Sequence, residues 1–228
     1  MTAEVSSLDR EATSKTLFVY ERLKARIVHN ELKPQEYLNE QALCLEYGVS
    51  KTPVREALQM LARNRLVVIV PSKGCYVSNI SVDLIREVFE VREIYECAAA
   101  RIAAGLPSRN QFAEILEDHD SYKEVDDQEI RKSLLSGYQI HEHIVNAAGN
   151  SFLSEYYSTI LDHILRIRIY FLGRFNSKRL SELTVEHKAI LAAIVKGDPD
   201  AAERAMKEHL DKSLLSINQL VLANRRGI

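Results

Sequence analysis

Val-Ser-Lys-Thr-Pro-Val-Arg-Glu-Ala-Leu, residues 49–58, has the features of a helix start. Gly48 suits the left-handed end of a preceding helix, and Ser50 or Thr52 can cap the next helix with a side-chain oxygen. Pro53 falls in the first turn, where its missing N–H costs nothing. The sequence therefore predicts two helices that are separated by only a few residues.

The exposed side of this helix start carries positive charge. Apolar residues that recur at helical spacing can face a core: Val54, Leu58 and Leu61. Lys51, Thr52 and Arg55 are left on the exposed first turn. Two cations there oppose the helix dipole, so an external phosphate could supply the missing anion. This arrangement is typical of the second helix of a helix-turn-helix, whose N-terminal end enters the major groove of DNA; the alternative is a plain solvated helix start.

The residues on either side complete a small domain. Residues 1–13 are polar and aperiodic, which predicts a mobile arm. A first helix is indicated by apolar residues at helical spacing: Leu17, Tyr20, Leu23 and Ile27. Asn39 opens a short second helix that ends at Gly48. After residue 64, two β-rich runs at 67–70 and 75–78 enclose a turn signal, which predicts a β-hairpin wing with Lys73 and Gly74 at its tip.

Residues 17–78 resemble the N-terminal domain of the GntR family of transcriptional regulators. The resemblance rests on Glu31-Leu-Lys-Pro-Gln-Glu-Tyr-Leu-Asn-Glu-Gln-Ala-Leu, on residues 48–58 and on the wing. It implies contacts with operator DNA by six residues: Gln41, Lys51, Thr52, Arg55, Lys73 and Gly74. The family usually has arginine at position 51, and lysine cannot make the same bidentate contact to guanine. The base preference at this position therefore does not follow from the family pattern.

Residues 79–228 predict an all-helical domain with six amphipathic stretches. Predicted helices run from Ser81 to Ala104, from Ser108, from Asp126 to Gly149, from Ser151 to about Phe175, up to Gly197, and from Asp198 to about Ala223. An antiparallel bundle would bury their apolar stripes. The size and helix count resemble the ligand-binding FCD domain of the FadR branch of the GntR family. The expected fold is mainly α, with an arm (1–13), a winged helix-turn-helix DNA-binding domain (14–78), and a helical domain for effector binding and dimerisation (79–228).

Three histidines lie within the apolar stripes of three predicted helices: His141, His187 and His209. A single such residue is commonly a hydrogen-bonded core histidine, but three that converge favour a shared site for Zn²⁺ or Ni²⁺. The FCD resemblance places metal ligands at the same positions. The Asp or Asn that the family has one turn before His141 is Gly137 here, beside Tyr138. Glycine inside a helix costs about 1 kcal/mol relative to alanine, so we expect it to leave room for a ligand.

Two polar residues share the apolar stripe of the first bundle helix, Arg92 and Glu96. As an ion pair at the rim, they would contribute only about 0.3–0.5 kcal/mol. The FCD resemblance favours the alternative that Arg92 faces a cavity and pairs with a carboxylate ligand. Arg168 is a second candidate for this role. The predicted effector-binding set is Arg92, Glu96, Gly137, Tyr138 and Arg168.

Composition limits the class of protein. Of 228 residues, 46% are apolar and 27% are charged, as in ordinary soluble proteins. The longest apolar run, 66–70, is too short to span a bilayer, and the N-terminus does not resemble a signal peptide, so we expect a cytoplasmic protein. The net charge of −2 combines +2 for residues 1–80 (11 Lys and Arg, 9 Asp and Glu) with −4 for the remainder. The cysteines fit neither a disulfide framework nor a zinc motif: Cys44, Cys75 and Cys97.

These features favour a ligand-responsive transcriptional regulator, a homodimeric repressor on an inverted repeat of double-stranded DNA. Its effector would be a small carboxylate, bound with the help of a divalent metal, Zn or Ni. One alternative is a regulator that senses the metal itself and has no organic effector. Another is a metal-dependent hydrolytic enzyme, since three His with an open position also describe hydrolytic zinc sites. Because no Asp or Glu is obviously placed as a general base, we expect no catalytic residues.

Overall fold

The computed structural model describes residues 7–120 and 138–225. The chain divides into two compact units, Met1–Ile80 and Ser81–Ile228. Among the described residues, no helix is long and apolar enough to cross a membrane.

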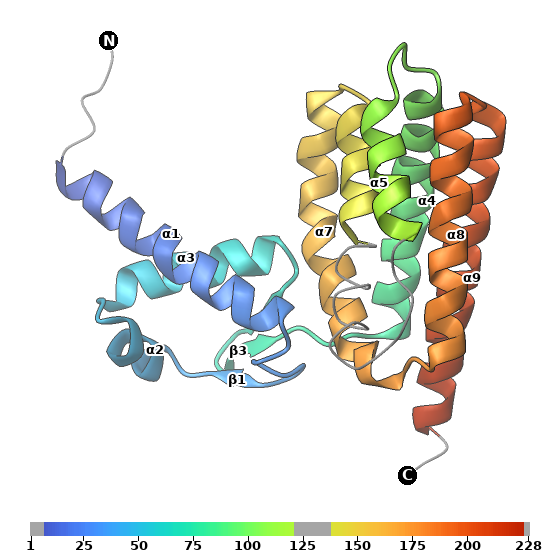
Figure 1. Cartoon of the computed structure of the whole chain (residues 1–228). Coiled ribbons are helices and arrows are strands. Elements are labelled where there is room, and N and C mark those ends of the chain that lie inside the picture. Colours follow the sequence, from blue (N-terminus) through green and yellow to red (C-terminus); the bar gives the residue numbers. More distant parts are fainter. Residues whose placement is uncertain (1–6, 121–137, 226–228) are drawn as a thin grey trace. The chain divides into compact units, whose positions relative to one another are not determined.

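The N-terminal unit is a three-helix domain with a small sheet (Figure 1). Its elements are α1 (Ser7–Val28), β1 (Tyr37–Leu38), α2 (Glu40–Tyr47), α3 (Lys51–Arg63), β2 (Val67–Val70) and β3 (Gly74–Val77). The strands are antiparallel in the order β1-β3-β2. The helices and the hairpin were predicted from the sequence. The two-residue strand β1 was not, because two residues carry no measurable period.

The first helix is longer than its apolar stripe predicted. α1 begins at Ser7, so residues 7–13 of the expected arm are helical, and residues 1–6 lie outside the described part. Residues 8–12, Leu-Asp-Arg-Glu-Ala, include good helix formers, and helical propensity does not need an apolar period. Propensity therefore extends the helix beyond the apolar stripe of its sequence.

The helix-turn-helix has the expected start and end signals, with one difference. The Asn39 side chain accepts a hydrogen bond from the backbone N–H of Ala42, and Gly48 ends α2 with φ +64°. Ser50 has the extended backbone of an N-cap, but its hydroxyl makes no capping hydrogen bond. The backbone thus adopts the predicted cap geometry, and the predicted side-chain cap is missing.

α3 is amphipathic, and its apolar face packs on α1. The shared core of this unit includes Val19, Leu23, Ile27, Val54, Ala57 and Leu61, each fully buried. Burial of this face fixes the rotation of α3 about its axis. Its opposite face, with the first-turn cations, is therefore held towards solvent.

The second unit is helical throughout its described part. Its elements are α4 (Val82–Ala104), α5 (Asn110–Asp120), helical residues 138–147, α7 (Ser151–Phe171), the short 3₁₀ helix η1 (Leu172–Arg174), α8 (Ser177–Lys196) and α9 (Pro199–Arg225). The long helices lie side by side as a bundle, with α4 against α7, α8 and α9, and α8 against α5 and α9 (Figure 1). This confirms the mainly α fold class. The predicted start of the third bundle helix, at residue 126, lies outside the described residues.

Several bundle helices begin or end at, or next to, the capping residues that the sequence predicted. The Ser81 hydroxyl accepts from the N–H of Leu84 at the start of α4, as predicted. Asn150, one residue before the predicted start, caps α7 in the same way. Gly197 ends α8 with φ +75°. These caps set where each helix starts or ends.

Candidate functional site

The first turn of α3 presents the predicted polar residues to solvent. Lys51, Thr52 and Arg55 are exposed, as is Gln41 on α2. Nε of Arg55 donates a hydrogen bond to Oε2 of Glu40 at 2.8 Å, on side chains that are 60% and 38% exposed. This bond uses only Nε, so the two terminal amino groups of Arg55 can still donate to a phosphate or a base. Glu40 therefore orients Arg55 without blocking it.

Gly74 has a structural reason to be glycine. Lys73 is exposed at the turn of the wing, and Gly74 follows with φ +108°. A Cβ atom at position 74 would lie 2.6 Å from Cε2 of Tyr37, whose ring also packs against Tyr76 with centroids 5.3 Å apart. The positive φ and the nearby ring both favour glycine. The shape of the wing thus accounts for Gly74 independently of DNA.

Inside the bundle, the structure brings His141, His187 and His209 together, as the apolar stripes predicted. They come from helical residues 138–147, from α8 and from α9, and are 2%, 3% and 0% exposed. One nitrogen from each ring can be chosen so that all three lie within 4.8 Å of one another, and the ring centroids are 4.7–5.3 Å apart. We call these three residues the histidine cluster. Their role as metal ligands stays a prediction.

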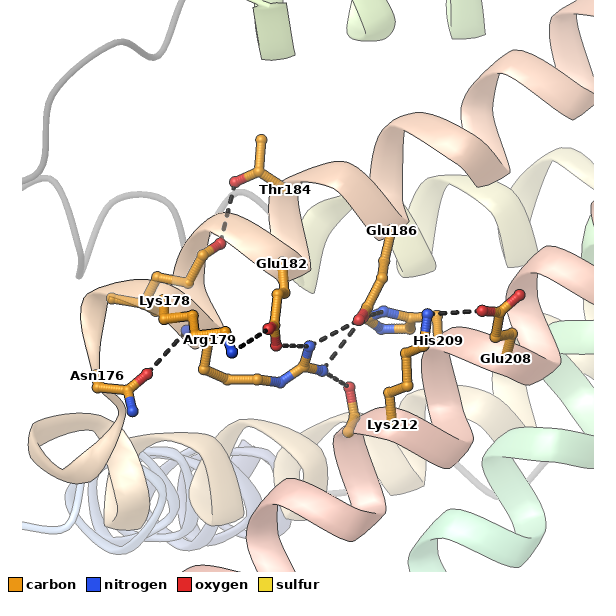
Figure 2. Close-up of polar contacts among 11 residues, drawn as sticks. Asn176, Lys178, Arg179, Glu182, Thr184, Glu186, Glu208, His209 and Lys212 are labelled. Carbon is orange, nitrogen blue, oxygen red and sulfur yellow. Dashed lines mark hydrogen bonds and ion pairs between the residues drawn. The ribbon is translucent and has the colours of Figure 1, made fainter.

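A carboxylate fixes the tautomer of His209. Nδ1 of His209 lies 2.8 Å from Oε2 of Glu186 in hydrogen-bond geometry (Figure 2). Since a carboxylate only accepts, Nδ1 carries the proton. Burial, followed by the nearby His141 and Arg92, holds the pKa of His209 well below its usual range, so the ring is neutral. Its Nε2 therefore has a lone pair, and this atom makes no hydrogen bond within the described part of the chain.

A second carboxylate, that of Glu96, lies beside Nδ1 of His141. Its Oε2 lies 2.7 Å from Nδ1 of His141, an ion-pair distance, although this contact is not counted among the side-chain hydrogen bonds. Its Oε1 accepts hydrogen bonds from Nε of Arg92 and from the hydroxyl of Tyr157, both at 2.7 Å. Although burial opposes ionisation, Arg92 and His141 hold the pKa of Glu96 well below its usual range. Glu96 is therefore a buried, ionised carboxylate within a closed polar network.

The Arg92–Glu96 pair does not lie at the rim, which was the less favoured of the two interpretations of the sequence. The two side chains are 2% and 0% exposed. The apolar stripe of α4 faces the bundle interior, and both residues lie on that stripe. The small energy of a surface i,i+4 pair therefore does not apply to them.

A narrow cavity lies between α4, α7, α8 and α9. Its volume is about 20 Å³, and its lining includes apolar side chains and three arginines: Arg92, Arg168 and Arg179. This is room for a water molecule, so an organic acid would enter only if lining side chains move. Burial and repulsion by Arg92 lower the pKa of Arg168 to about 10. The lining therefore favours a negatively charged occupant.

The remaining predicted positions divide into described and undescribed ones. Tyr138 is half-buried, and burial raises its pKa. Gly137 lies outside the described residues. His143 is exposed, as expected for a residue outside the cluster. His163 is buried, 7% exposed, on α7.

Sequence reasoning missed three residues of the site: Arg179, Glu186 and Tyr157. Arg179 donates to both oxygens of Glu186, at 2.7 and 3.1 Å, and Tyr157 donates to Glu96. The spacing of Arg179 and Glu186 by seven residues, two helical turns on one face of α8, is a signal that could have been used. Tyr157 carried no such signal, because its partner is on another helix.

The fold defines a class: a winged helix-turn-helix unit joined to a helical unit with a buried polar site, as in transcription regulators. The sequence pattern of the FCD domain matches residues 87–212, more than half of the chain. The pattern of the bacterial regulatory proteins of the gntR family matches residues 15–77. The chain therefore belongs to the GntR family of regulators, in the group that carries an FCD domain.

Individual relatives agree with this family. The HTH-type transcriptional repressor RspR of Escherichia coli K12 is 28% identical over 203 residues, covering 89% of this chain and 88% of RspR. The repressor GlaR of the same organism is 25% identical over 219 residues, covering 93% of this chain and 100% of GlaR. A putative GntR regulator from Rhodococcus sp. RHA1 shares the fold with a TM-score of 0.72 at 23% identity, covering 90% of this chain and 98% of that one. E. coli McbR/YncC also shares the fold, with a TM-score of 0.70 at 21% identity, covering 91% of this chain and 98% of that one.

Proposed function

We propose that this protein is a repressor that binds operator DNA through its winged helix and senses a small organic acid, together with a divalent metal ion, in its FCD domain. The observation that carries the sensing part is a buried cluster of three histidines beside a cavity lined by three arginines. The names of RspR and GlaR, both called repressors, support the sign of regulation. A cytoplasmic location is part of this proposal.

The residues fit a divalent metal. His209 is held as a neutral ring with its Nε2 lone pair away from Glu186, and Nε2 of His141 likewise makes no hydrogen bond within the described residues. Buried nitrogen atoms without partners are costly unless something binds them. His141, His187 and His209 would hold Zn²⁺ or Ni²⁺, which favour imidazole ligands. A bound ion would supply a positive centre that attracts a carboxylate.

The cavity supports an anionic effector. Three arginine side chains line the cavity, Arg92, Arg168 and Arg179, and Arg168 is repelled by Arg92. The lowered pKa of Arg168 means that a negative charge beside it would be stabilising. The apolar remainder of the lining suits a short carbon skeleton. We therefore assign a small carboxylic acid as the effector class, with Arg168 as its first partner and with Glu96 and Tyr138 in its surroundings.

Two other functions make different demands on the same site. A metal-dependent hydrolase needs a general base with a pKa near the working pH. Carboxylates do lie beside the histidines, unlike the sequence-based expectation, but Glu96 and Glu186 are each held by an arginine, and Glu96 has a strongly lowered pKa. This favours the regulator over the enzyme. A regulator that senses only metal would show DNA affinity that follows the metal concentration without any organic acid.

One purified sample can test the proposed function. Metal content is measured first, and carboxylic acids are then screened by thermal shift on metal-loaded and chelator-treated protein. A hit is added to a gel-shift titration with promoter DNA. The proposal expects bound metal, stabilisation by at least one acid that depends on metal, and a change in DNA affinity. Metal-dependent DNA binding without any responding acid would favour the metal-only regulator, and turnover of a hydrolysable ester would favour the enzyme.

Arg55→Ala should weaken operator binding by about 1–3 kcal/mol, because an arginine at the N-terminal turn of a recognition helix can read a base. Arg63→Ala is a matched control, since Arg63 is exposed at the opposite end of α3. Gel-shift titrations at one fixed salt concentration measure both variants. Equal affinities for Arg55→Ala and the wild type would remove Arg55 from the interface.

The protein should bind DNA as a homodimer on an inverted repeat. A single small recognition module buries only about 600–1,000 Å² of protein surface, which is too little for tight specific binding. Two half-sites about one helical turn apart are then expected, or a multiple of this spacing. Sedimentation gives the oligomeric state and footprinting gives the protected length. A monomer that protects a single half-site would rule the dimer out.

A further inference from the structure

The histidine cluster and the arginine-lined cavity are joined by two similar chains of contacts. Each chain runs from an arginine of the cavity lining, through a buried glutamate, to Nδ1 of a histidine. One chain is Arg179–Glu186–His209, and the other is Arg92–Glu96–His141. They use different helices, so their similarity does not follow from a repeated local motif.

The first chain has complete hydrogen-bond geometry. Figure 2 shows the carboxylate of Glu186 between the guanidinium of Arg179 and the ring of His209. Arg179 donates through both terminal amino groups, at 2.7 and 3.1 Å, and its second amino group also donates to the Ser213 hydroxyl at 3.2 Å. Nε of Arg179 is buried and makes no hydrogen bond within the described residues. The arginine therefore retains a donor for a further partner while it holds Glu186.

The second chain is more deeply buried. Arg92 donates to both oxygens of Glu96, at 2.7 and 3.3 Å, and Glu96 lies 2.7 Å from Nδ1 of His141. The guanidinium of Arg92 also packs over the ring of Phe89, 4.8 Å from its centroid. Arg92 and Phe89 both line the cavity. A displacement of Arg92 in the cavity wall can thus affect His141 through Glu96 alone.

We propose that Glu96 and Glu186 are positioning residues through which the cavity arginines act on the metal affinity of the histidine cluster. This inference rests on the proposed function, in which the cluster binds metal and the cavity binds an anion. A carboxylate at Nδ1 orients a metal-binding imidazole and raises the basicity of its Nε2. An anion that draws Arg179 towards itself weakens the hold of Arg179 on Glu186. More of the glutamate charge then acts on His209, which raises metal affinity, and by linkage metal raises anion affinity equally.

The test uses the full chain and Zn²⁺ affinity, measured by competition with a chromophoric chelator. Glu186→Gln keeps an oxygen acceptor and removes the charge, so Zn²⁺ affinity should fall by about 10–100-fold. Glu208→Gln is the matched control: Glu208 precedes His209 directly, yet its side chain is 67% exposed and bonds to Lys212. This control should stay within about twofold of the wild type. Glu186 is the better first target because Arg179 keeps Ser213 and Glu182 as partners.

A double-mutant cycle separates the chain of contacts from simple packing. Zn²⁺ affinity is compared for Arg179→Met, Glu186→Gln and the double variant, with Arg179→Lys in reserve if the Met variant does not fold. If Arg179 acts through Glu186, its replacement should matter much less when Glu186→Gln is already present, and the effects should differ from additivity by more than about twofold. The Nδ1–H signal of His209 in the zinc-loaded protein should also shift in Glu186→Gln.

The outcomes distinguish this inference from the proposed function. If the wild type can be loaded with neither Zn²⁺ nor Ni²⁺, both are wrong. If the wild type binds Zn²⁺ and Glu186→Gln matches Glu208→Gln, only the inference is wrong. Additive effects of Arg179→Met and Glu186→Gln would likewise overturn it, because the arginine and the glutamate would then act separately.

Discussion

His187→Ala should lower Zn²⁺ or Ni²⁺ affinity by more than about 100-fold, since even changes behind the ligands cost about 10–100-fold. His187 is 3% exposed, and its ring contacts both other histidines. Removing one of three ligands leaves two, too few to hold the ion against water. The response of DNA binding to the effector should disappear with the metal. Metal content after dialysis and a gel shift with a responding acid measure the two effects.

DNA binding without effector should survive this change. The N-terminal unit has its own core, formed by α1, α3 and the sheet, and His187 lies in the other unit. His143→Ala is the control, because His143 is exposed and its Nδ1 bonds to the backbone carbonyl of Gln139 on its own helix. His187→Asn keeps most of the volume, so it separates the lost ligand from a packing defect. A wild type that cannot be loaded, with an effector response that persists in His187→Ala, would make the cluster an ordinary part of the core.

The winged unit was predictable because its signals are local. Asn39, Gly48 and Pro53 mark helix ends within a few residues of the sequence. Asn39 acts through a side-chain cap, and Gly48 and Pro53 act through their own backbone geometry. The apolar period of α3 then fixes which side chains are exposed. The same reasoning predicted that three histidines point inward, since each lies within a helical stripe of its own.

The links between helices were not predictable in this way. Glu96 receives a hydrogen bond from Tyr157 on α7 and contacts His141, and neither partner is near in sequence. Periodicity states that a residue faces inward, but not which residue meets it there. For this reason a rim position for Arg92 and Glu96 was left open, and Glu186 was not among the predicted site residues.

Arg92→Met should destabilise the protein by about 3–5 kcal/mol, because it leaves the buried carboxylate of Glu96 without its cation. Both side chains are almost completely buried. Desolvation lowers the pKa of Arg92, but Glu96 outweighs it, so that the net pKa is raised and the pair is ionised. Urea unfolding followed by circular dichroism should show the loss as a lower transition midpoint.

α4 provides its own control for this result. Arg86 and Glu90 have the same i,i+4 spacing and the same 2.7 Å separation, but their side chains are 54% and 58% exposed. Arg86→Met should therefore leave the midpoint nearly unchanged, since water replaces the lost partner. Arg92→Met/Glu96→Gln should recover much of the lost stability, because the neutral amide keeps an acceptor for the Tyr157 hydroxyl and no charge remains unpaired. If Arg92→Met and Arg86→Met shift the midpoint equally, burial of an unpaired Glu96 carboxylate does not explain the contribution of Arg92 to stability.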